Sequence, residues 1–446
     1  MPASGPHITI VGGGSVAWAP DLVRDMMLTP ALNGARVVLY DLDRKAADLV
    51  KAFLDKLANT LGVKMTIVAT NQQARALRGA DYVVITISTG GLDAMGHDLA
   101  IPEKFGIYHT VGDTTGPGGW ARFIRNFDVF MELGKAINRQ CPEALIFNYT
   151  NPMATLTDVL ARVCANPVVG LCHGLFENLE FIKLLYKLKS EDKISLRYAG
   201  LNHFFFITQG LVGNRDILVD LARKLRHHTL TDLAPPTPTD LMGFHSNQEV
   251  ATELFHQTGT MPYLGDRHTC EFLPQYLTDR RQIKRYQLVR TSISLRRRLF
   301  HQRLKSLKRM IEGRIPKSFQ IRSREAAADM IDAHVRGDSF IDVGNLPNIG
   351  QIDNLPRKVV VETAVRVDRN GFSPVAFGSL PASILAMIQP HAQGYQMAVD
   401  ACFASDRKGV TQALRVDPLC SHLDGEKLRN LADRLLHAHR RYIKAI

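Results

Sequence analysis

Two pairs of neighbouring residues in this chain together offer one thiol and two imidazole side chains. Cys172 is followed directly by His173, and Asn202 is followed by His203. A thiolate and an imidazole together suit a divalent metal of borderline softness, so we interpret Cys172 and His203 as metal ligands. The alternative is that Cys172 is a core thiol and His203 a hydrogen-bonded interior imidazole, because each residue type is common in protein interiors.

A glycine-rich run near the start of the sequence predicts a dinucleotide site. Gly12, Gly14 and Ser15 follow a short apolar stretch and precede a helical pattern, an order that lays a pyrophosphate on a helix N-terminus. The next apolar strand ends in Asp41, where an acid grips the ribose of NAD and disfavours the 2'-phosphate of NADP. Ala17 takes the last small position of the usual G-x-G-x-x-G pattern, which leaves a purely structural turn as the alternative.

The elements that must position these residues alternate between apolar strands and helices. This order predicts an α/β fold with a Rossmann-like doubly wound parallel sheet, similar to the lactate and malate dehydrogenases. We expect residues 1–195 to form an NAD-binding domain and residues 196–446 a C-terminal α+β domain for metal and substrate. The predicted strands span residues 8–11, 36–41, 81–88, 144–148, 167–171, 201–211 and 357–365, and predicted helices span residues 17–28, 383–403 and 424–445.

Polar residues follow two of these strands, at the edge where open α/β sheets bind ligands. Thr89 comes directly after the strand at residues 81–88, where a cofactor would cross the sheet. Asn148 and Asn151 belong to the Asn-Pro turn after the next strand and would project into the crevice, with an ordinary turn cap as the alternative. The loop at residues 111–119 is rich in glycine and hydroxyls, which favours a functional loop over an ordinary surface loop.

Composition narrows the class of protein. A chain of 446 residues with 45% hydrophobic content can bury a large core and exceeds the size of one ordinary domain. We find no apolar span of about twenty residues and no signal-peptide pattern, so we expect a cytoplasmic protein without membrane contact. The six cysteines are scattered, which predicts free thiols in a reducing compartment.

The net charge of +12 is concentrated in one part of the chain. Residues 280–324 hold 16 Lys and Arg residues and a single acid, Glu312, and such a stretch could neutralise the phosphates of a nucleic acid. Apolar residues recur from Leu288 to Ile311 at roughly helical spacing, which instead predicts a helix with its charges on solvated faces. We therefore expect no nucleic-acid partner, and either interpretation allows a field that attracts an anionic substrate.

Several motifs along the chain resemble those of the family 4 glycoside hydrolases. Together they extend over nearly the full chain in the expected order, and several motifs in register are more specific than any one alone. The matching segments are residues 12–15, 112–119, 148–153, 172–174, 200–204, 265–268, 271–272, 348–356 and 360–362.

The resemblance implies a glycosidase that uses NAD and a divalent metal, expected to be Mn²⁺, in place of the usual two carboxylates. NAD would take a hydride from C3 of the sugar, and the metal on Cys172 and His203 would polarise the C2 and C3 oxygens. A base would then remove the C2 proton and the glycosidic oxygen would leave C1. Addition of water and return of the hydride would regenerate the cofactor.

The resemblance also assigns proton-transfer roles. His173 falls where some relatives place the acid that protonates the leaving group. The base is a tyrosine or an aspartate in the family, so Tyr263 and Asp266 compete for this role. We favour Asp266, because residues 265–268 match the relatives that act on uronates.

The substrate is expected to be a small α-linked uronide. Asn151, Asn148 and Asn202 would contact the sugar, and the run from Cys172 to Gly174 resembles the branch acting on α-galacturonides, with α-glucuronides next. A substrate carboxylate would need a guanidinium group that can form two hydrogen bonds with it, and Arg267 is the nearest candidate. The alternative is that Arg267 forms a salt bridge inside its own loop. The family leads us to expect a homodimer or homotetramer.

Two other classes of function stay open at this point. One is an NAD-dependent 2-hydroxy-acid dehydrogenase, which shares the nucleotide-binding half and the Asn-Pro turn but needs no thiolate ligand. A metal held tightly by Cys172 would count against it. The other is a non-catalytic protein that binds NAD, or nucleic acid through residues 280–324, and a steep salt dependence of duplex binding would favour it.

Overall fold

The computed structural model describes residues 5–234 and 247–444 of the chain. Its first half contributes short apolar strands that are largely buried, as a sheet with helices on both faces requires. These strands are β1 His7–Val11, β2 Arg36–Tyr40, β3 Thr66–Thr70, β4 Tyr82–Ile85, β5 Leu145–Asn148 and β6 Val168–Gly170.

The second half contributes antiparallel strands. A hairpin joins β7 Ile194–Leu201 to β8 Phe204–Val212, and its turn consists of Asn202 and His203. The other strands are β9 Arg215–Asp216, β10 Met261–Pro262, β11 Phe340–Pro347, β12 Val360–Asp368 and β13 Gly371–Pro374.

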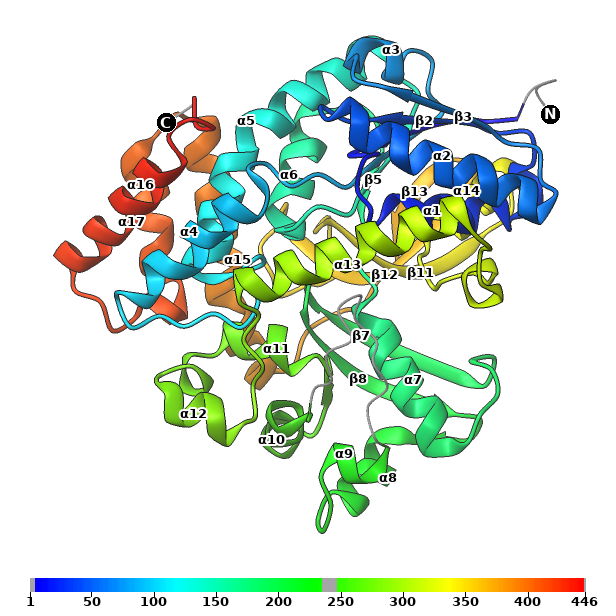
Figure 1. Ribbon diagram of the computed structural model, residues 1–446. Coiled ribbons are helices and arrows are strands. Elements are labelled where there is room, and N and C mark those ends of the chain that lie inside the picture. The colour runs from blue at the N-terminus through cyan, green and yellow to red at the C-terminus, as the bar shows by residue number, and fades with distance from the viewer. Residues whose placement is uncertain (1–4, 235–246, 445–446) are drawn as a thin grey trace.

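One sheet runs through both halves of the described chain (Figure 1), in the order β10-β8-β7-β12-β11-β6-β5-β4-β1-β2-β3. The stretch from β6 to β3 is parallel and has the strand order of a doubly wound nucleotide-binding sheet. The antiparallel part begins where β11 pairs with β6, at Asn345 and Gly170. Because the sheet is continuous across this seam, the division at residues 195 and 196 stays a prediction.

Helices pack on both faces of the sheet and around the hairpin (Figure 1). In the first half they are α1 Ala19–Met27, α2 Arg44–Leu61, α3 Gln73–Leu77, α4 Gly91–Glu103, α5 Gly116–Gln140, α6 Met153–Val163 and α7 Gly174–Tyr186. In the second half they are α8 Ile217–Lys224, α9 Leu230–Leu233, α10 Glu249–Thr258, α11 Asp266–Thr269, α12 Arg280–Arg285, α13 Ile293–Glu312, α14 Ala327–Arg336, α15 Ala382–Phe403, α16 Arg407–Ala413 and α17 Gly425–His439.

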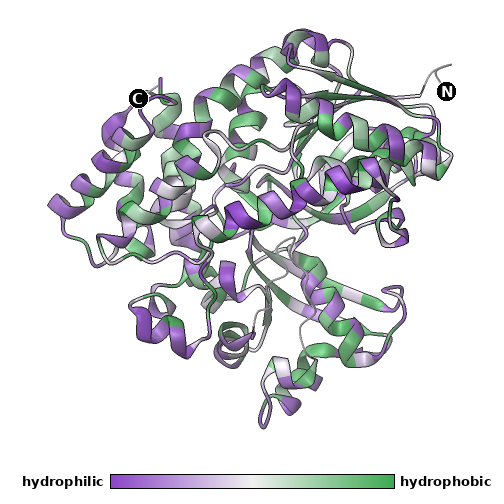
Figure 2. Ribbon diagram, in the orientation of Figure 1, coloured by the Kyte–Doolittle hydropathy of each residue, from purple (hydrophilic) through white to green (hydrophobic). Residues whose placement is uncertain are grey.

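Successive side chains of the parallel strands point to opposite faces of the sheet, where they are buried in two hydrophobic cores. α5, α6, α15 and α17 pack on one face, and α1, α2 and α14 pack on the other. Figure 2 shows apolar colouring along the strands and polar colouring on the outward sides of the surrounding helices. Local signals fix the helix ends: α2 begins where Asp43 accepts a hydrogen bond from the Ala46 N–H and ends at Gly62, whose φ is 68°.

The Rossmann-like fold predicted from the sequence is confirmed. β3 is not predicted from the sequence, because it is short and its apolar residues, Ile67 to Ala69, lie between two threonines. The single strand predicted over residues 201–211 is wrong at its start, because the chain reverses direction at Asn202 and His203.

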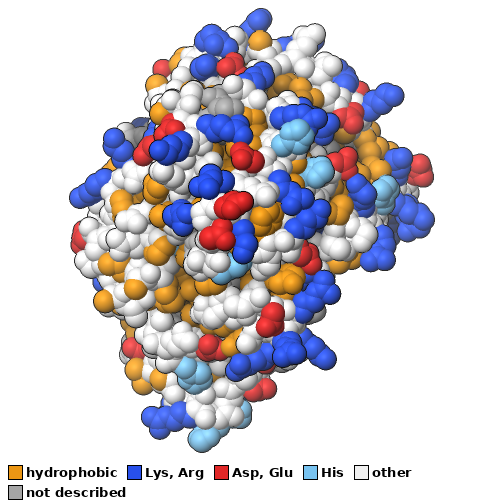
Figure 3. Space-filling view, turned by 90° about the vertical axis from the view of Figure 1, so that its left-hand side faces the viewer, with side chains coloured by type: hydrophobic (Ala, Val, Ile, Leu, Met, Phe, Trp, Pro, Cys, Tyr) orange, Lys and Arg blue, Asp and Glu red, His pale blue; other side chains and the backbone are white. Residues whose placement is uncertain are grey.

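The basic window forms α12 and α13, and its predicted solvated face needs a correction. The residues of α13 around Leu307 pack against α1 and α2, but other α13 side chains line a cavity. On the face shown in Figure 3, Lys and Arg side chains are interspersed with acids instead of forming one uniform patch. In residues 5–234 and 247–444, no helix combines the length and apolar composition that crossing a membrane requires.

Candidate active site

A cavity of about 810 Å³ lies at the carboxyl ends of the parallel strands. The segments that follow β4, β5 and β6 form one wall, from Thr86 to Ser88, from Tyr149 to Asn151 and from Leu171 to His173. α13 contributes the opposite wall, which includes Arg296 and Phe300. Ligands bind to open α/β sheets at this edge, so the cavity is the candidate active site.

Cys172 and His203 meet in this cavity. The Cys172 Sγ lies 3.1 Å from the His203 Nε2, although one residue follows β6 and the other stands in the β7–β8 turn. Sγ and Nε2 are the atoms through which these side chains bind a divalent metal. Among the described residues, no three Cys, His, Asp or Glu side chains are grouped as a metal site. A metal on this pair would therefore keep positions for the oxygens of a ligand.

A hydrogen-bond chain orients the ring of His203. The Thr114 hydroxyl donates to Asp113 Oδ1 at 3.0 Å and lies 3.0 Å from His203 Nδ1. Because the Thr114 proton points to Asp113, Nδ1–H of His203 donates to Thr114, and Nε2 keeps its lone pair. His203 also has a φ of 63°, a left-handed conformation that is uncommon for non-glycine residues.

Burial controls the charge of both candidate ligands. It lowers the pKa of His203 to about 4, so this imidazole is neutral near pH 7. It also raises the pKa of the Cys172 thiol far above its usual value, and the Glu362 carboxylate adds to this effect. The protein alone keeps the thiol protonated, and a bound cation is what would ionise it.

The glycine turn after β1 has the geometry of a dinucleotide loop. Gly12 has a φ of 92°, and a side chain there would collide with the Thr86 carbonyl oxygen. The Gly14 N–H donates to the Asp41 carboxylate at 2.9 Å, which places this acid beside the turn at the end of β2. Ser15 lines the cavity. The structure thus brings these residues together, and their contacts with a cofactor stay a prediction.

Thr89 and Asn148 do not face the cavity as the sequence predicts. The Thr89 hydroxyl donates to the Asn126 side chain on α5 at 2.6 Å. The Asn148 side chain is fully buried, donates to Thr157 at 3.1 Å and accepts from the Thr150 N–H at 2.9 Å. Both residues hold neighbouring segments in place, because their polar atoms are already used by those segments.

The two remaining asparagines differ from each other. Asn151 lines the cavity, and its Oδ1 is buried without a hydrogen-bond partner among the described residues. This oxygen is free to accept a hydrogen bond from a ligand. The Asn202 Nδ2 instead donates to Glu362 at 2.8 Å, and Asn202 is not part of the cavity wall. The predicted substrate contact of Asn202 is therefore not supported.

Two candidate acid–base groups line the cavity, each beside a carboxylate. His173 Nδ1 lies 3.4 Å from a Glu325 oxygen, and the Tyr263 hydroxyl lies 3.4 Å from a Glu177 oxygen. The Tyr263 ring stacks on the ring of His203, with 5.8 Å between the ring centroids. Both groups are therefore placed beside the candidate metal ligands.

The preference for Asp266 as the base is not supported. Its two carboxylate oxygens accept hydrogen bonds from the Val250 N–H at 2.9 Å and the Ala251 N–H at 3.0 Å, in the first turn of α10. Asp266 is buried and does not line the cavity, whereas Tyr263 does. The carboxylate stabilises the N-terminus of α10, where a negative charge interacts favourably with the helix dipole.

Five arginines line the same cavity, and two of them, Arg122 and Arg296, act on the Asp113 carboxyl. Burial would raise the pKa of the Asp113 carboxyl, but Arg122 and Arg296 lower it below its usual value. Burial lowers the pKa of Arg296 to about 10, which leaves this group charged near pH 7. The five arginines of the cavity wall outnumber its four acids, Asp93, Asp113, Glu177 and Glu180, and this small excess of cations favours an anionic ligand.

The contacts of Arg267 and Arg296 differ. Arg267 donates to the Val289 carbonyl at 3.2 Å and to Thr291 at 3.3 Å. Arg296 is held by Nη2, which donates to Thr291 at 2.7 Å and to the Val111 carbonyl at 3.2 Å. The Nε of Arg296 has no hydrogen-bond partner among the described residues. Arg296 is thus a second candidate, beside Arg267, for binding a carboxylate.

Family comparisons agree with this geometry. The model of the family 4 glycosyl hydrolases matches residues 7–187, and the model of their C-terminal domain matches residues 198–420. The chain belongs to the family 4 glycosyl hydrolases. An alpha-galacturonidase of Bacillus subtilis is 32% identical over 437 residues, which cover 95% of this chain and 96% of that protein.

Solved structures share the fold of this glycosyl hydrolase. A Bacillus subtilis protein named as a glucosidase has a TM-score of 0.88 at 30% identity and covers 97% of this chain and 100% of its own. A 6-phospho-beta glucosidase from Thermotoga maritima, solved with manganese, NAD⁺ and glucose-6-phosphate, has a TM-score of 0.79 at 22% identity. Here the match covers 99% of this chain and 100% of that one.

The structure adds residues to the site of this glycosyl hydrolase that the sequence does not single out. Asp113 and Thr114 lie in a loop predicted to be functional, and His268 lies in a matched motif with its ring 4.0 Å from that of His203. Those motifs could have drawn attention to all three. Arg296 carries no such signal, because its neighbours in the basic window are also arginines.

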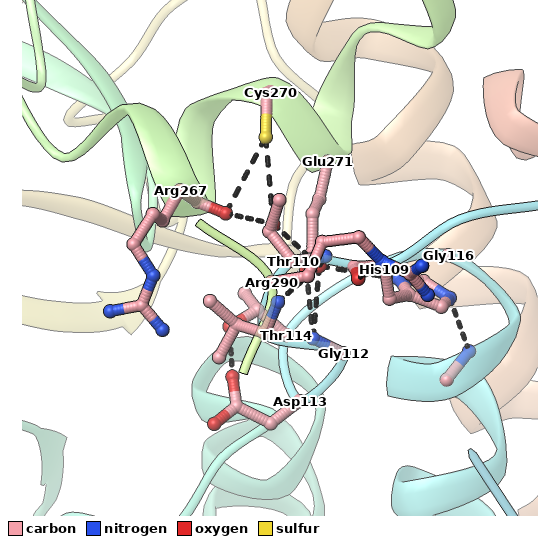
Figure 4. A network of polar contacts seen from close by, with 12 residues as sticks. His109, Thr110, Gly112, Asp113, Thr114, Gly116, Arg267, Cys270, Glu271 and Arg290 are labelled. Atoms are coloured by element: carbon pink, nitrogen blue, oxygen red, sulfur yellow. Dashed lines mark hydrogen bonds and ion pairs between the residues drawn. The ribbon is translucent and has the colours of Figure 1, made fainter. Parts of the chain in front are cut away.

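A buried carboxylate holds the loop that carries Asp113 and Thr114 (Figure 4). Glu271 Oε1 accepts hydrogen bonds from the N–H groups of Thr110 and Val111 at 2.7 Å and of Gly112 at 2.9 Å. Three backbone donors on one charged oxygen fix the backbone of the loop. The orientation of the His203 ring therefore depends on a residue outside the cavity.

Glu271→Gln should lower the free energy of unfolding by about 2–3 kcal/mol, because an amide offers one acceptor oxygen and a neutral one to these donors. Urea unfolding measures this change. Glu103→Gln is the control, since Glu103 is partly exposed and paired with Arg290 at 2.7 Å, so its loss should cost less than about 1 kcal/mol. Equal effects of the two substitutions would contradict the role given to Glu271.

Proposed function

We propose that this family 4 glycosyl hydrolase is an α-galacturonidase that releases galacturonic acid from α-linked galacturonides, with NAD⁺ and Mn²⁺ as cofactors. The observation that carries the proposal is the Cys172–His203 pair in a cavity that Arg296 and four further arginines line. Ligands for a metal beside an excess of cations suit a sugar acid. The similarity to an alpha-galacturonidase supports the same substrate class.

The cofactors would occupy neighbouring parts of the cavity. Gly12 to Ser15 would hold the pyrophosphate of NAD⁺, while Cys172 Sγ and His203 Nε2 would hold the metal. NAD⁺ reversibly accepts a hydride from a sugar carbon, and Mn²⁺ withdraws electron density from adjacent oxygens. The lone pair that Thr114 leaves on Nε2 fits this metal-binding role.

The residues of this chain supply the proton transfers. Tyr263 would accept the proton from C2 of the sugar while its own hydroxyl proton passes to the Glu177 carboxylate, to which that hydroxyl donates. His173 would donate a proton to the glycosidic oxygen as the C1–O bond breaks, with Glu325 beside its other ring nitrogen. Asn151 Oδ1 would accept a hydrogen bond from a sugar hydroxyl.

The sugar carboxylate would bind the guanidinium groups of Arg296 and Arg267. A planar guanidinium can pair with a carboxylate through two parallel hydrogen bonds, which a neutral hydroxymethyl group cannot accept in the same way. An α-glucuronide is the second candidate, because it carries the same carboxylate and differs from a galacturonide only in configuration at C4.

The proposed function is tested by incubating the protein with α-1,4-digalacturonate, NAD⁺, Mn²⁺ and a thiol reductant. We expect release of galacturonic acid without accumulation of NADH, and at least about a 100-fold lower rate when either cofactor is omitted. Chromatography and absorbance at the NADH maximum measure these outcomes. NADH accumulation with an intact disaccharide would instead indicate a dehydrogenase, and turnover of the α-glucuronide alone would favour the second candidate.

Tyr263→Phe should reduce kcat by about 10²–10⁴-fold, because it removes the proposed proton acceptor. Asp266→Asn should lower stability, because its amide keeps only one of the two acceptors for the α10 N–H groups, but the folded variant should retain activity within about threefold, since Asp266 does not line the cavity. Steady-state kinetics on the two folded variants separates the candidates. Loss of activity in Asp266→Asn, with Tyr263→Phe active, would restore Asp266 as the base.

Arg296→Gln should lower the ratio of kcat/KM for an α-galacturonide to that for the neutral α-galactoside by about 10–100-fold. This factor corresponds to losing one hydrogen-bonded charge pair worth about 1.5–3 kcal/mol. Arg298→Gln is the control, because Arg298 lies on the same helix, is exposed and is not part of the cavity wall. A ratio that stays constant in Arg296→Gln would exclude Arg296 from carboxylate recognition.

A further inference from the structure

Glu362 on β12 is a fully buried carboxylate that the proposed chemistry does not use. It is not part of the cavity wall. Its Oε2 accepts a hydrogen bond from the Asn202 Nδ2 at 2.8 Å and another from the Asn345 Nδ2 at 2.8 Å. One carboxylate oxygen therefore links an asparagine in the β7–β8 turn to an asparagine on β11.

Each of these asparagines lies next to a segment that carries a candidate metal ligand. Asn202 directly precedes His203 in the β7–β8 turn. Asn345 on β11 stands opposite Gly170 on β6, and its Nδ2 lies 3.4 Å from the Gly170 carbonyl oxygen. Gly170 is the last residue of β6, just before the segment that carries Cys172.

The backbone pairing places Glu362 on β12, one strand away from the seam between β11 and β6. Glu362 stands opposite Gly200 on β7 and opposite Asn345 on β11. β11 in turn joins the parallel part of the sheet through β6. The strand that ends near Cys172 and the hairpin that carries His203 therefore reach each other through β11 and β12, beside this one side chain.

The polar atoms of this cluster are not arranged as a simple stabilising ion pair. The hydrogen-bond partners of Glu362 are two neutral amides. Glu362 Oε1, Asn202 Oδ1 and Asn345 Oδ1 are buried without partners among the described residues. Buried acceptors without donors cost stability, and apolar side chains would fill the same space without this cost. The cluster is therefore better explained by what it positions than by the stability it adds.

We propose that Glu362 is a positioning residue for the metal site, which fixes the separation of Cys172 and His203 through Asn202 and Asn345. This inference rests on the proposed function, because it takes the Cys172–His203 pair as the metal site. Glu362 does not touch the metal, the cofactor or the sugar. Its effect is exerted through the two asparagines, so that the metal would meet an arrangement of ligands that is already set.

The test measures binding of Mn²⁺ and of NAD⁺ separately, by electron paramagnetic resonance and by calorimetry, on the full chain. Glu362→Ala should weaken Mn²⁺ binding by about 10–100-fold, the usual effect of losing a group that orients a metal ligand. NAD⁺ binding should stay within about threefold. Glu362→Gln should bind Mn²⁺ within about threefold of wild type, because its amide oxygen can still accept from both asparagines.

Two further variants keep the test decisive if Glu362→Ala does not fold. Asn345→Ala breaks the link to Gly170 and should weaken Mn²⁺ binding in the same direction. Asp98→Asn is the matched control, since Asp98 is equally buried but accepts from Arg125 at 2.8 Å and from His439 at 2.7 Å. It should lower the melting temperature and leave Mn²⁺ affinity unchanged.

The outcomes separate this inference from the proposed function. Wild-type Mn²⁺ affinity in folded Glu362→Ala or Asn345→Ala overturns the positioning role while the metal site stands. Equal losses of Mn²⁺ and NAD⁺ affinity in Glu362→Ala also overturn it, because they indicate a general loss of structure. Failure of the wild-type protein to bind Mn²⁺ overturns the proposed metal site and the positioning role together.

Discussion

The contact between the Cys172 Sγ and the His203 Nε2 is the constraint on which the rest of the site depends. The two residues come from opposite sides of the seam at which the antiparallel part of the sheet joins the parallel part. Neither part alone brings Cys172 and His203 together. The proposed metal site therefore depends on the continuous sheet, because this sheet holds the end of a parallel strand against the turn of a hairpin.

Around this contact, the structure divides its polar groups between the cavity and its support. Asn151, His173, Tyr263 and Arg296 line the cavity, where they can meet a ligand. Behind them, buried carboxylates fix the backbone: Glu271 holds the glycine-rich loop and Asp266 holds the start of α10. A site that handles hydride and proton transfers needs such rigidity, because small displacements of reacting groups are costly.

Local patterns in the sequence predict the fold and the positions of the motifs well. The glycine turn, Asp41 and the strand ends depend on short-range signals, and the structure places each where the sequence indicates. The directions of the side chains are not predictable in the same way. Asn148 ends a strand, Asn202 lies in a turn and Asp266 begins a helix, but other residues of the protein already occupy their polar atoms. The sequence also does not single out Arg296, because only the tertiary packing of α13 places this side chain in the cavity wall.

The most direct measurement of the central claim is to run the reaction on α-1,4-digalacturonate in D₂O and to locate deuterium in the released galacturonic acid by nuclear magnetic resonance. Removal and return of the C2 proton by a residue of this site predicts one deuterium at C2 and none at C3, because the hydride stays on the cofactor between steps. Product released without deuterium at C2 would contradict the account, since direct hydrolysis of the glycosidic bond breaks no C–H bond.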